Sequence, residues 1–163
     1  MARKLFGTDG VRGVAGDLLT AELALGLGRA AASHSPAERP QVLLIRDTRE
    51  SGEMLEAAMA AGVTAAGGDA LLGGVLPTPA APLLLQRYGF DLAAVISASH
   101  NPFHDNGIKF FGPDGDKLSD ATELEIEAQL GSAPAANPDV GRVRALHGTL
   151  EDYLRALHER FQG

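Results

Sequence analysis

The sequence predicts an α/β fold, a single-domain three-layer sandwich in which one mixed four-stranded sheet lies between helices. Strand and helix patterns alternate along the chain, which is typical of this class. Turn residues at 105–107 lie between the last two strand patterns and favour an antiparallel pair there. A length of 163 residues suits one domain with a core of its own.

The first half of the chain predicts a loop, two helices and one strand. Residues 3–14 are rich in glycine and predict a loop with positive φ angles. Thr20 caps a helical pattern in which apolar residues recur at four-residue spacing over 23–31. The apolar run 41–45 predicts a buried strand. Alanines and glycines in the next helix, about 51–66, predict close packing of that helix on the sheet.

The middle of the chain predicts three strands and one helix. Residues 70–76 form a short apolar run that prolines interrupt at 77–79, and prolines suit the first turn of the helix expected next. That helix extends to about Tyr88, and Gly89 can cap it. Strands follow at 92–96 and 107–111.

The last third predicts two helices joined by a linker. Residues 120–130 favour a helix by composition, and Asp120 with Glu123 has the spacing of a capping box. Glycines and prolines make 131–147 a surface crossing. The final helix, 149–161, is amphipathic, with an apolar stripe of three leucines, Leu150, Leu154 and Leu157.

The composition excludes several classes of protein. A net charge of −7 argues against a nucleic-acid partner, which needs a basic face. The chain has no cysteine, which fits a cytoplasmic location, and its N-terminus lacks the apolar run of a signal peptide. The longest uncharged stretch, 70–86, is broken by prolines, so no membrane span is expected.

The segment 96–102 (ISASHNP) is the strongest candidate site. It follows an apolar strand pattern, and open α/β sheets bind their ligands at strand ends. A serine needs an activating group, and the adjacent His100 is poorly placed for a hydrolase triad with Ser99. A phosphoryl-transfer site, with His100 and Lys109 supplying charge, fits better, although a polar turn remains an alternative.

Three other stretches carry charge in loop-like contexts. The glycines of 7–13 allow backbone N–H groups and Arg12 to approach an anion, or they form only an entry loop. In 46–52 the side chain of Asp47 could hold Arg49 or cap the following helix. Lys109 should point away from its apolar neighbours, toward an anion or toward solvent. The histidines show no metal-ligand spacing.

Taken in order, five motifs resemble the first domain of the α-D-phosphohexomutases. The resemblance covers about residues 3–130, and the motifs that carry it are 6–13 (FGTDGVRG), 47–52 (DTRESG), 77–79 (PTP), 96–102 (ISASHNP) and 105–109 (DNGIK). The opening motif and the ISASHNP form resemble most the bacterial branch that acts on hexosamine phosphates.

The resemblance implies a set of functional residues. Ser99 is expected to be the phosphoserine, and His100, Lys109 and Arg12 the groups that stabilise charge and handle protons. Arg12, Ser97, Asn101 and Lys109 are expected to bind phosphate or substrate. One Mg²⁺ would be bound through the Ser99 phosphate and an aspartate loop that is absent from the chain, and a sugar 1,6-bisphosphate would be the intermediate.

The resemblance also implies an incomplete enzyme. Residues 1–147 are expected to be domain I, and 148–163 a helix leading toward an absent second domain. The substrate would be a hexosamine phosphate, glucosamine 6-phosphate or glucosamine 1-phosphate, and the isolated chain is expected to be inactive. A domain acting on mannose or glucose phosphates, and a non-catalytic module that forms a homodimer, remain alternatives.

Overall fold

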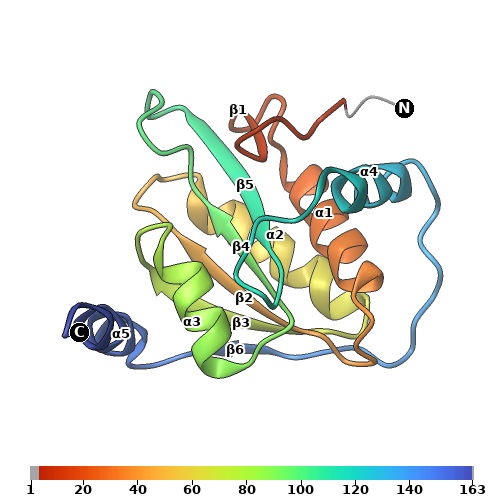
Figure 1. Cartoon of the computed structure of the whole chain (residues 1–163). Coiled ribbons are helices and arrows are strands. Elements are labelled where there is room, and N and C mark those ends of the chain that lie inside the picture. Colours follow the sequence, from red (N-terminus) through yellow and green to blue (C-terminus); the bar gives the residue numbers. More distant parts are fainter. Residues whose placement is uncertain (1–3, 163) are drawn as a thin grey trace.

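The computed structural model describes residues 4–162 and has helices on both faces of one six-stranded sheet (Figure 1). The strands lie in the order β1-β5-β4-β2-β3-β6. The strands are β1 (Val11–Val14), β2 (Gln41–Arg46), β3 (Asp69–Val75), β4 (Leu92–Ile96), β5 (Asp105–Phe111) and β6 (Val143–Ala145). The helices are α1 (Ala21–His34), α2 (Gly52–Ala65), α3 (Ala80–Tyr88), α4 (Asp120–Gln129) and α5 (Thr149–Phe161).

The sheet is mixed, as predicted, but it has two more strands than the four expected. Strand β2 pairs in parallel with β3 and β4, and β5 is antiparallel to both β4 and β1. The two extra strands, β1 and β6, form the edges of the sheet. Both are short, and all three residues of β6 are exposed, so neither strand has the apolar alternation that marks a strand in a sequence.

The larger core lies between the sheet and the layer of α1, α2 and α4. Glycines let α1 and α2 approach each other closely. A Cβ on Gly28 would come within 2.5 Å of the Met59 carbonyl oxygen, and one on Gly62 would overlap the Leu25 carbonyl oxygen. The small residues of α2 therefore serve the contact between two helices, and the predicted close packing on the sheet is wrong for Gly62.

The opposite face has a smaller core under α3 and α5. Gly89 ends α3 in the left-handed conformation, with φ of 70°, as its sequence position predicted. Figure 1 shows α5 beside α3, far from the N-terminus. The hydroxyl of Tyr88 donates to Asp152 at 2.6 Å, and the hydroxyl of Thr149 donates to the carbonyl oxygen of Gly73 at 2.7 Å. These two contacts, the buried Tyr153 and an ion pair between Arg87 and Glu159 hold α5 against α3 and the sheet.

Two sequence predictions about the last helices need correction. The hydroxyl that caps α4 belongs to Ser119, which accepts from the Thr122 amide, so the predicted capping box at Asp120 is displaced by one residue. In α5 the predicted leucine stripe is only partly buried, because Leu150 and Leu154 are 51% and 54% exposed. The helix turns Thr149 and Tyr153 toward the protein instead.

The segment between α4 and β6 crosses the surface, as predicted, before β6 joins the sheet edge (Figure 1). Asp69 fixes this edge, since its carboxylate accepts from Arg39 and from the Arg142 amide. The hydrogen bond from Arg39 lowers the pKa of Asp69. Within residues 4–162, no helix has the length and apolar character that crossing a membrane requires.

Candidate active site

The candidate site lies where two adjacent parallel strands end. Arg46 at the end of β2 pairs with Ile96 at the end of β4, and the Asp47 amide donates to the Ile96 carbonyl oxygen at 3.1 Å. The chain continues from β2 into residues 47–51 and from β4 into residues 97–104, which we call the serine loop. Because the two strands are neighbours, segments 50 residues apart in sequence meet at one edge of the sheet.

Ser99 has an unusual backbone conformation within the serine loop. Its φ is 54°, and it is the sole non-glycine residue among those described that has a positive φ. Such a conformation costs about 1–3 kcal/mol and persists where the surrounding structure imposes it. The side chain is exposed, and its Oγ lies 3.4 Å from Nδ1 of His100. The hydroxyl is therefore presented to an incoming molecule from a strained position.

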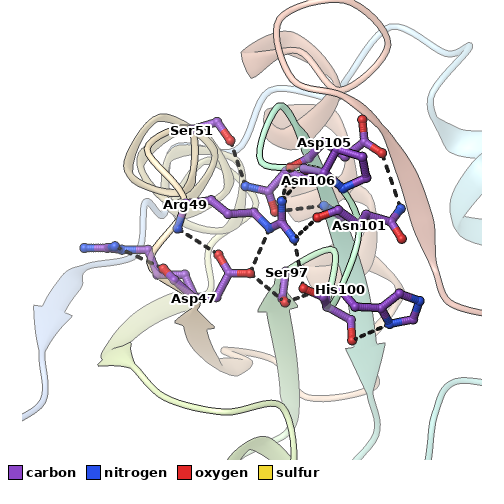
Figure 2. A network of polar contacts seen from close by, with 12 residues as sticks. Asp47, Arg49, Ser51, Ser97, His100, Asn101, Asp105 and Asn106 are labelled. Atoms are coloured by element: carbon purple, nitrogen blue, oxygen red, sulfur yellow. Dashed lines mark hydrogen bonds and ion pairs between the residues drawn. The ribbon is translucent and has the colours of Figure 1, made fainter.

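Arg49 holds the serine loop through hydrogen bonds from its guanidinium, which lies in the middle of the polar network (Figure 2). Its Nη2 donates to the carbonyl oxygens of Ser99 and Asn101, each at 2.9 Å. Its Nη1 donates to the carbonyl oxygens of Pro102 at 2.6 Å and Asp105 at 3.1 Å. The Arg49 side chain is only 10% exposed, so these charge-assisted hydrogen bonds are largely shielded from water.

Asp47 orients both Arg49 and Ser97. Its Oδ1 accepts from the Arg49 amide at 3.0 Å, and its Oδ2 accepts from Arg49 Nε at 3.1 Å. The same Oδ2 accepts from the Ser97 hydroxyl at 2.8 Å. The Ser97 oxygen in turn accepts from the Ser99 amide at 3.0 Å. Of the two roles considered for Asp47 in the sequence, holding Arg49 is therefore the one that the structure shows.

A second polar contact ties β5 to the start of α2. The amide nitrogen of the buried Asn106 side chain donates to Ser51 Oγ at 2.9 Å, and its oxygen accepts from the Gly107 amide at 2.8 Å. The Gly107 carbonyl oxygen accepts from the Ser97 amide at 2.9 Å. The predicted turn at 105–107 is wrong in place, because β5 already begins at Asp105 and the reversal occurs within the serine loop.

Arg12 and Lys109 lie on neighbouring strands and on the same face of the sheet. Arg12 is opposite Gly107 in the register of β1 with β5, and Lys109 is two residues further along β5. Residues opposite each other or two apart in a strand share a face. Lys109 pairs with Val95, whose side chain belongs to the core under α3, so this is the α3 face.

The two cations on this face differ in their partners. Lys109 Nζ lies 5.4 Å from the centre of the Phe111 ring, and no carboxylate pairs with it in the described part of the chain. Arg12 has a buried Nε atom without a hydrogen-bond partner. An unpaired buried N–H is costly, so the position favours an acceptor that arrives with a ligand. Within the described part of the chain, neither Arg12 nor Lys109 forms a hydrogen bond with Ser99.

Arg46, unlike Arg12 and Lys109, already faces carboxylates of the protein. Its guanidinium faces two glutamates of α2, Glu56 at 3.6 Å and Glu53 at 3.7 Å. Burial raises the pKa of Glu56, and the charge of Arg46 opposes that rise. Arg46 and Arg49 thus pair with carboxylates of the protein, whereas neither Arg12 nor Lys109 forms an ion pair within residues 4–162.

An open groove of about 790 Å³ runs beside the serine loop. Its walls come from the serine loop, from residues 47–51 and from the turn after β1, and Met54 and Phe103 supply exposed apolar surface. Ser99 and Asn101 line this groove, whereas Arg12, Lys109 and His100 do not. Ser99 therefore borders the groove, whereas the two cations of the α3 face are not part of its lining.

The described residues contain no group of three or more His, Cys, Asp or Glu side chains that could hold a metal ion. What the chain itself offers is an exposed hydroxyl on a clamped loop, an adjacent imidazole and two cations on the neighbouring strands. Such a set can accept an anionic group and stabilise its charge.

The structure brings several of the predicted site residues together and shows contacts that the sequence did not predict. Ser97, Ser99, His100 and Asn101 share one loop, as expected. The hydrogen bonds from the Arg49 guanidinium to four backbone carbonyls, which we call the Arg49 clasp, were not predicted. The contact of Asn106 with Ser51 was not predicted either. The spacing of Asp47 and Arg49 carried some signal, because an aspartate often accepts from the amide two residues on.

A scan against family models finds one match, Phosphoglucomutase/phosphomannomutase, alpha/beta/alpha domain I, over residues 3–136. Two curated relatives, both named phosphoglucosamine mutase, are similar over nearly the whole chain. The protein of Chromobacterium violaceum is 51% identical over 99% of this chain, and that of Mycobacterium ulcerans is 54% identical over 93%. These alignments cover 38% and 36% of the relatives, so the chain spans little more than a third of their length.

A solved structure gives the same result for the fold. The crystal structure of a phosphoglucomutase/phosphomannomutase family protein from Burkholderia thailandensis superposes with a TM-score of 0.77 at 29% sequence identity. The match covers 88% of this chain and 33% of that protein.

Proposed function

Since the chain belongs to the phosphoglucomutase/phosphomannomutase family, whose domain I it matches over residues 3–136, we propose that it is the phosphoserine-bearing domain of a phosphoglucosamine mutase. Ser99 would carry the phosphoryl group that the enzyme, an intramolecular phosphotransferase, gives to its substrate and regains. Curated relatives with that name are more than half identical to the chain, which supports the hexosamine phosphate as substrate.

One observation carries the proposal. Ser99 is an exposed serine at the end of a parallel strand, held in a left-handed conformation by a loop that five hydrogen bonds of Arg49 side-chain nitrogens secure. A residue that only closes a turn has no need of this strain. A residue that must meet a phosphorus atom in line with a leaving oxygen does, because phosphoryl transfer is catalysed mostly by positioning and charge.

The reaction would run in two half-reactions. In the first, the P–Oγ bond of phosphoserine 99 breaks while a bond forms between that phosphorus and the C1 hydroxyl oxygen of glucosamine 6-phosphate. The proton of the sugar hydroxyl ends on Ser99 Oγ, and His100, with Nδ1 3.4 Å from Oγ, is placed to deliver a proton there. In the second, the sugar 1,6-bisphosphate has turned around, and a bond forms between Ser99 Oγ and the 6-phosphorus while the bond from that phosphorus to the sugar O6 breaks. The proton of Ser99 Oγ ends on O6, leaving glucosamine 1-phosphate.

The remaining site residues would bind and orient phosphate. The orphaned Nε of Arg12 would donate to a phosphate oxygen, and Lys109 would add charge from the same face. Asn101 lines the groove with Ser99 and would contact substrate from that side, and Ser97 would support the serine from beneath.

The proposed enzyme would use Mg²⁺, to which this chain would contribute one ligand. The Ser99 phosphate would be its single ligand from this chain, since the described residues offer no carboxylate cluster. Mg²⁺ prefers few protein carboxylates together with phosphate oxygens, which fits a metal shared with another part of the protein. When bound, it would neutralise charge on the transferring phosphoryl group.

The proposal extends to domain organisation, location and assembly. Residues 1–147 would form domain I and 148–163 would lead to a second domain, although residues 1–3 and 163 lie outside the described part. The full protein would act in the cytoplasm and would form a homodimer through this domain, which light scattering of the purified protein would detect. A mutase for mannose or glucose phosphates is the second candidate, because the Burkholderia structure belongs to a family named for both activities.

Intact-mass measurement tests the function directly. The full-length protein that contains this domain is incubated with glucosamine 1,6-bisphosphate and should gain one phosphate, which peptide mapping should place on Ser99. Ser99→Ala should gain none, and a control in the exposed linker, Ser132→Ala, should behave as the wild type. The isolated chain should show no conversion of glucosamine 6-phosphate. Phosphate on another residue, or turnover by the isolated chain, would contradict the proposal.

A further inference from the structure

The polar contacts beneath Ser99 converge on one carboxylate, and we propose that Asp47, acting through Arg49 and Ser97, is a positioning residue that holds Ser99 in its left-handed conformation. The inference rests on the proposed role of Ser99 as phosphoryl acceptor. It assigns Asp47 and Arg49 no contact with the substrate. Their effect is on the backbone to which the reacting oxygen is attached.

Both polar groups of the Ser99 backbone are held by side chains. The amide donates to Ser97 Oγ at 3.0 Å, and the carbonyl oxygen accepts from Arg49 Nη2 at 2.9 Å. A residue with φ of 54° lies in a sparsely populated region for any side chain but glycine. Holding the peptide groups on both sides of its Cα leaves the backbone little freedom to return to a common conformation.

The two holding groups share one acceptor, Oδ2 of Asp47. Ser97 has a single hydroxyl proton and donates it to this oxygen at 2.8 Å, so a lone pair is left to face the Ser99 amide. Arg49 Nε donates to the same oxygen at 3.1 Å. The guanidinium is planar, so fixing Nε also fixes the directions of Nη1 and Nη2. Loss of the Asp47 carboxylate would thus free both the Ser97 hydroxyl and the Arg49 guanidinium.

Arg49 also determines where the carbonyl oxygens of the loop point. Three of them, at residues 99, 101 and 102, accept from its guanidinium, as does the carbonyl oxygen of Asp105 at the start of β5. A carbonyl that points at Arg49 does not turn its negative end toward a phosphate at the Ser99 hydroxyl. Groups arranged in advance in this way need no reorganisation during the reaction. The clasp therefore favours an anion at Ser99 without binding the anion itself.

Hydrogen exchange of the 163-residue chain tests the network apart from any activity. In Ser97→Ala the Ser99 amide loses its acceptor and should exchange about tenfold faster, whereas the Val95 amide in β4 should be unaffected. Asp47→Asn should give the same acceleration. Ser97→Thr keeps the hydroxyl and should restore slow exchange. Glu50→Gln changes an exposed side chain in the segment 47–51, next to Arg49, and its Ser99 amide should exchange at the wild-type rate. Equal Ser99 exchange in Ser97→Ala and the wild type would overturn the proposal.

Single-turnover kinetics of the full-length protein provide the functional half. Transfer from glucosamine 1,6-bisphosphate to Ser99 should slow about 100-fold in Asp47→Asn with KM little changed, because misplacement of a reacting group costs rate more than binding. If the wild type gains phosphate on Ser99 and Asp47→Asn does so at the same rate, the positioning role is wrong. If the wild type gains none, the proposed function fails, and the exchange measurement still decides the network. Should Asp47→Asn not fold, Ser97→Ala with Ser97→Thr takes its place in both assays.

Discussion

Polar side chains attach both the serine loop and helix α5 to the rest of the protein. The contacts that hold the loop are shielded from water, whereas one side of the helix stays exposed. Arg49 and Asp47 secure the loop with hydrogen bonds that reach four backbone carbonyls, and Arg49 is almost fully shielded. The helix is held by Tyr88 and Thr149, while Leu154 on its surface stays more than half exposed.

The difference follows from what each region has to do. A serine that exchanges a phosphoryl group, as proposed for Ser99, must keep one geometry, which accounts for a strained backbone held by charge-assisted contacts. Helix α5 needs only a defined direction, which the hydrogen bonds of Tyr88, Thr149 and Arg87 and the buried Tyr153 can provide. Substitutions in the loop should therefore cost more stability than equivalent substitutions that loosen the helix.

The largest effect is expected for Arg49→Met. It leaves the Asp47 carboxylate and the loop carbonyls without their donor, and breaking a shielded ion pair of this kind costs about 3 kcal/mol in the free energy of unfolding. Urea denaturation of the chain measures it. Arg160→Met replaces an exposed arginine of α5 and should change stability by less than about 0.5 kcal/mol. Equal losses in the two variants would mean that the loop is no better secured than the helix surface.

A smaller effect is expected for Tyr88→Phe, which removes the hydroxyl that donates to Asp152. The loss should be about 1.5 kcal/mol, since the acceptor is charged. Leu154→Gln on the exposed side of the same helix should change the free energy of unfolding by less than about 0.5 kcal/mol. A larger loss in Leu154→Gln than in Tyr88→Phe would show that the helix is held by its leucine stripe after all.

The same contact predicts a dependence on pH. Burial and the hydrogen bond to Asp152 raise the pKa of Tyr88 to about 12. A pKa raised by folding means that the contact stabilises the protein fully below the ordinary tyrosine pKa of about 10, and that this stabilisation is lost as the pH rises through 12. Thermal unfolding between pH 9 and pH 12 should therefore converge for the wild type and Tyr88→Phe. A constant difference across that range would contradict the assignment.

The sequence predicted the central elements well because their patterns are local. The strands predicted at 41–45, 70–76, 92–96 and 107–111 match β2, β3, β4 and β5 to within two residues at each end, and Thr20 and Gly89 mark helix ends by their own chemistry. The edge strands were missed because β6 joins the sheet by backbone contacts alone. The stripe of α5 was misjudged because a helix with several apolar side chains does not itself reveal which of them a neighbour will cover.

In the site, too, features with a local sequence pattern could be predicted and contacts between distant segments could not. Ser99 and its neighbours could be located because they are consecutive in the sequence at a strand end. The Arg49 clasp could not, because its acceptors are backbone carbonyls about 50 residues away, which exist for any sequence there. The strain at Ser99 was likewise hidden, since serine carries no preference for a positive φ.

The stability difference between Ser99→Gly and Ser99→Ala tests most directly whether the serine is held under strain. Both variants lack the hydroxyl, so they differ only in the Cβ atom that disfavours the left-handed conformation. Glycine should give the higher free energy of unfolding, by about 1 kcal/mol, although alanine is the more stable residue at ordinary positions. Equal stability, or a more stable alanine variant, would contradict the account, because Ser99 would then be free to leave the conformation in which the clasp is inferred to hold it.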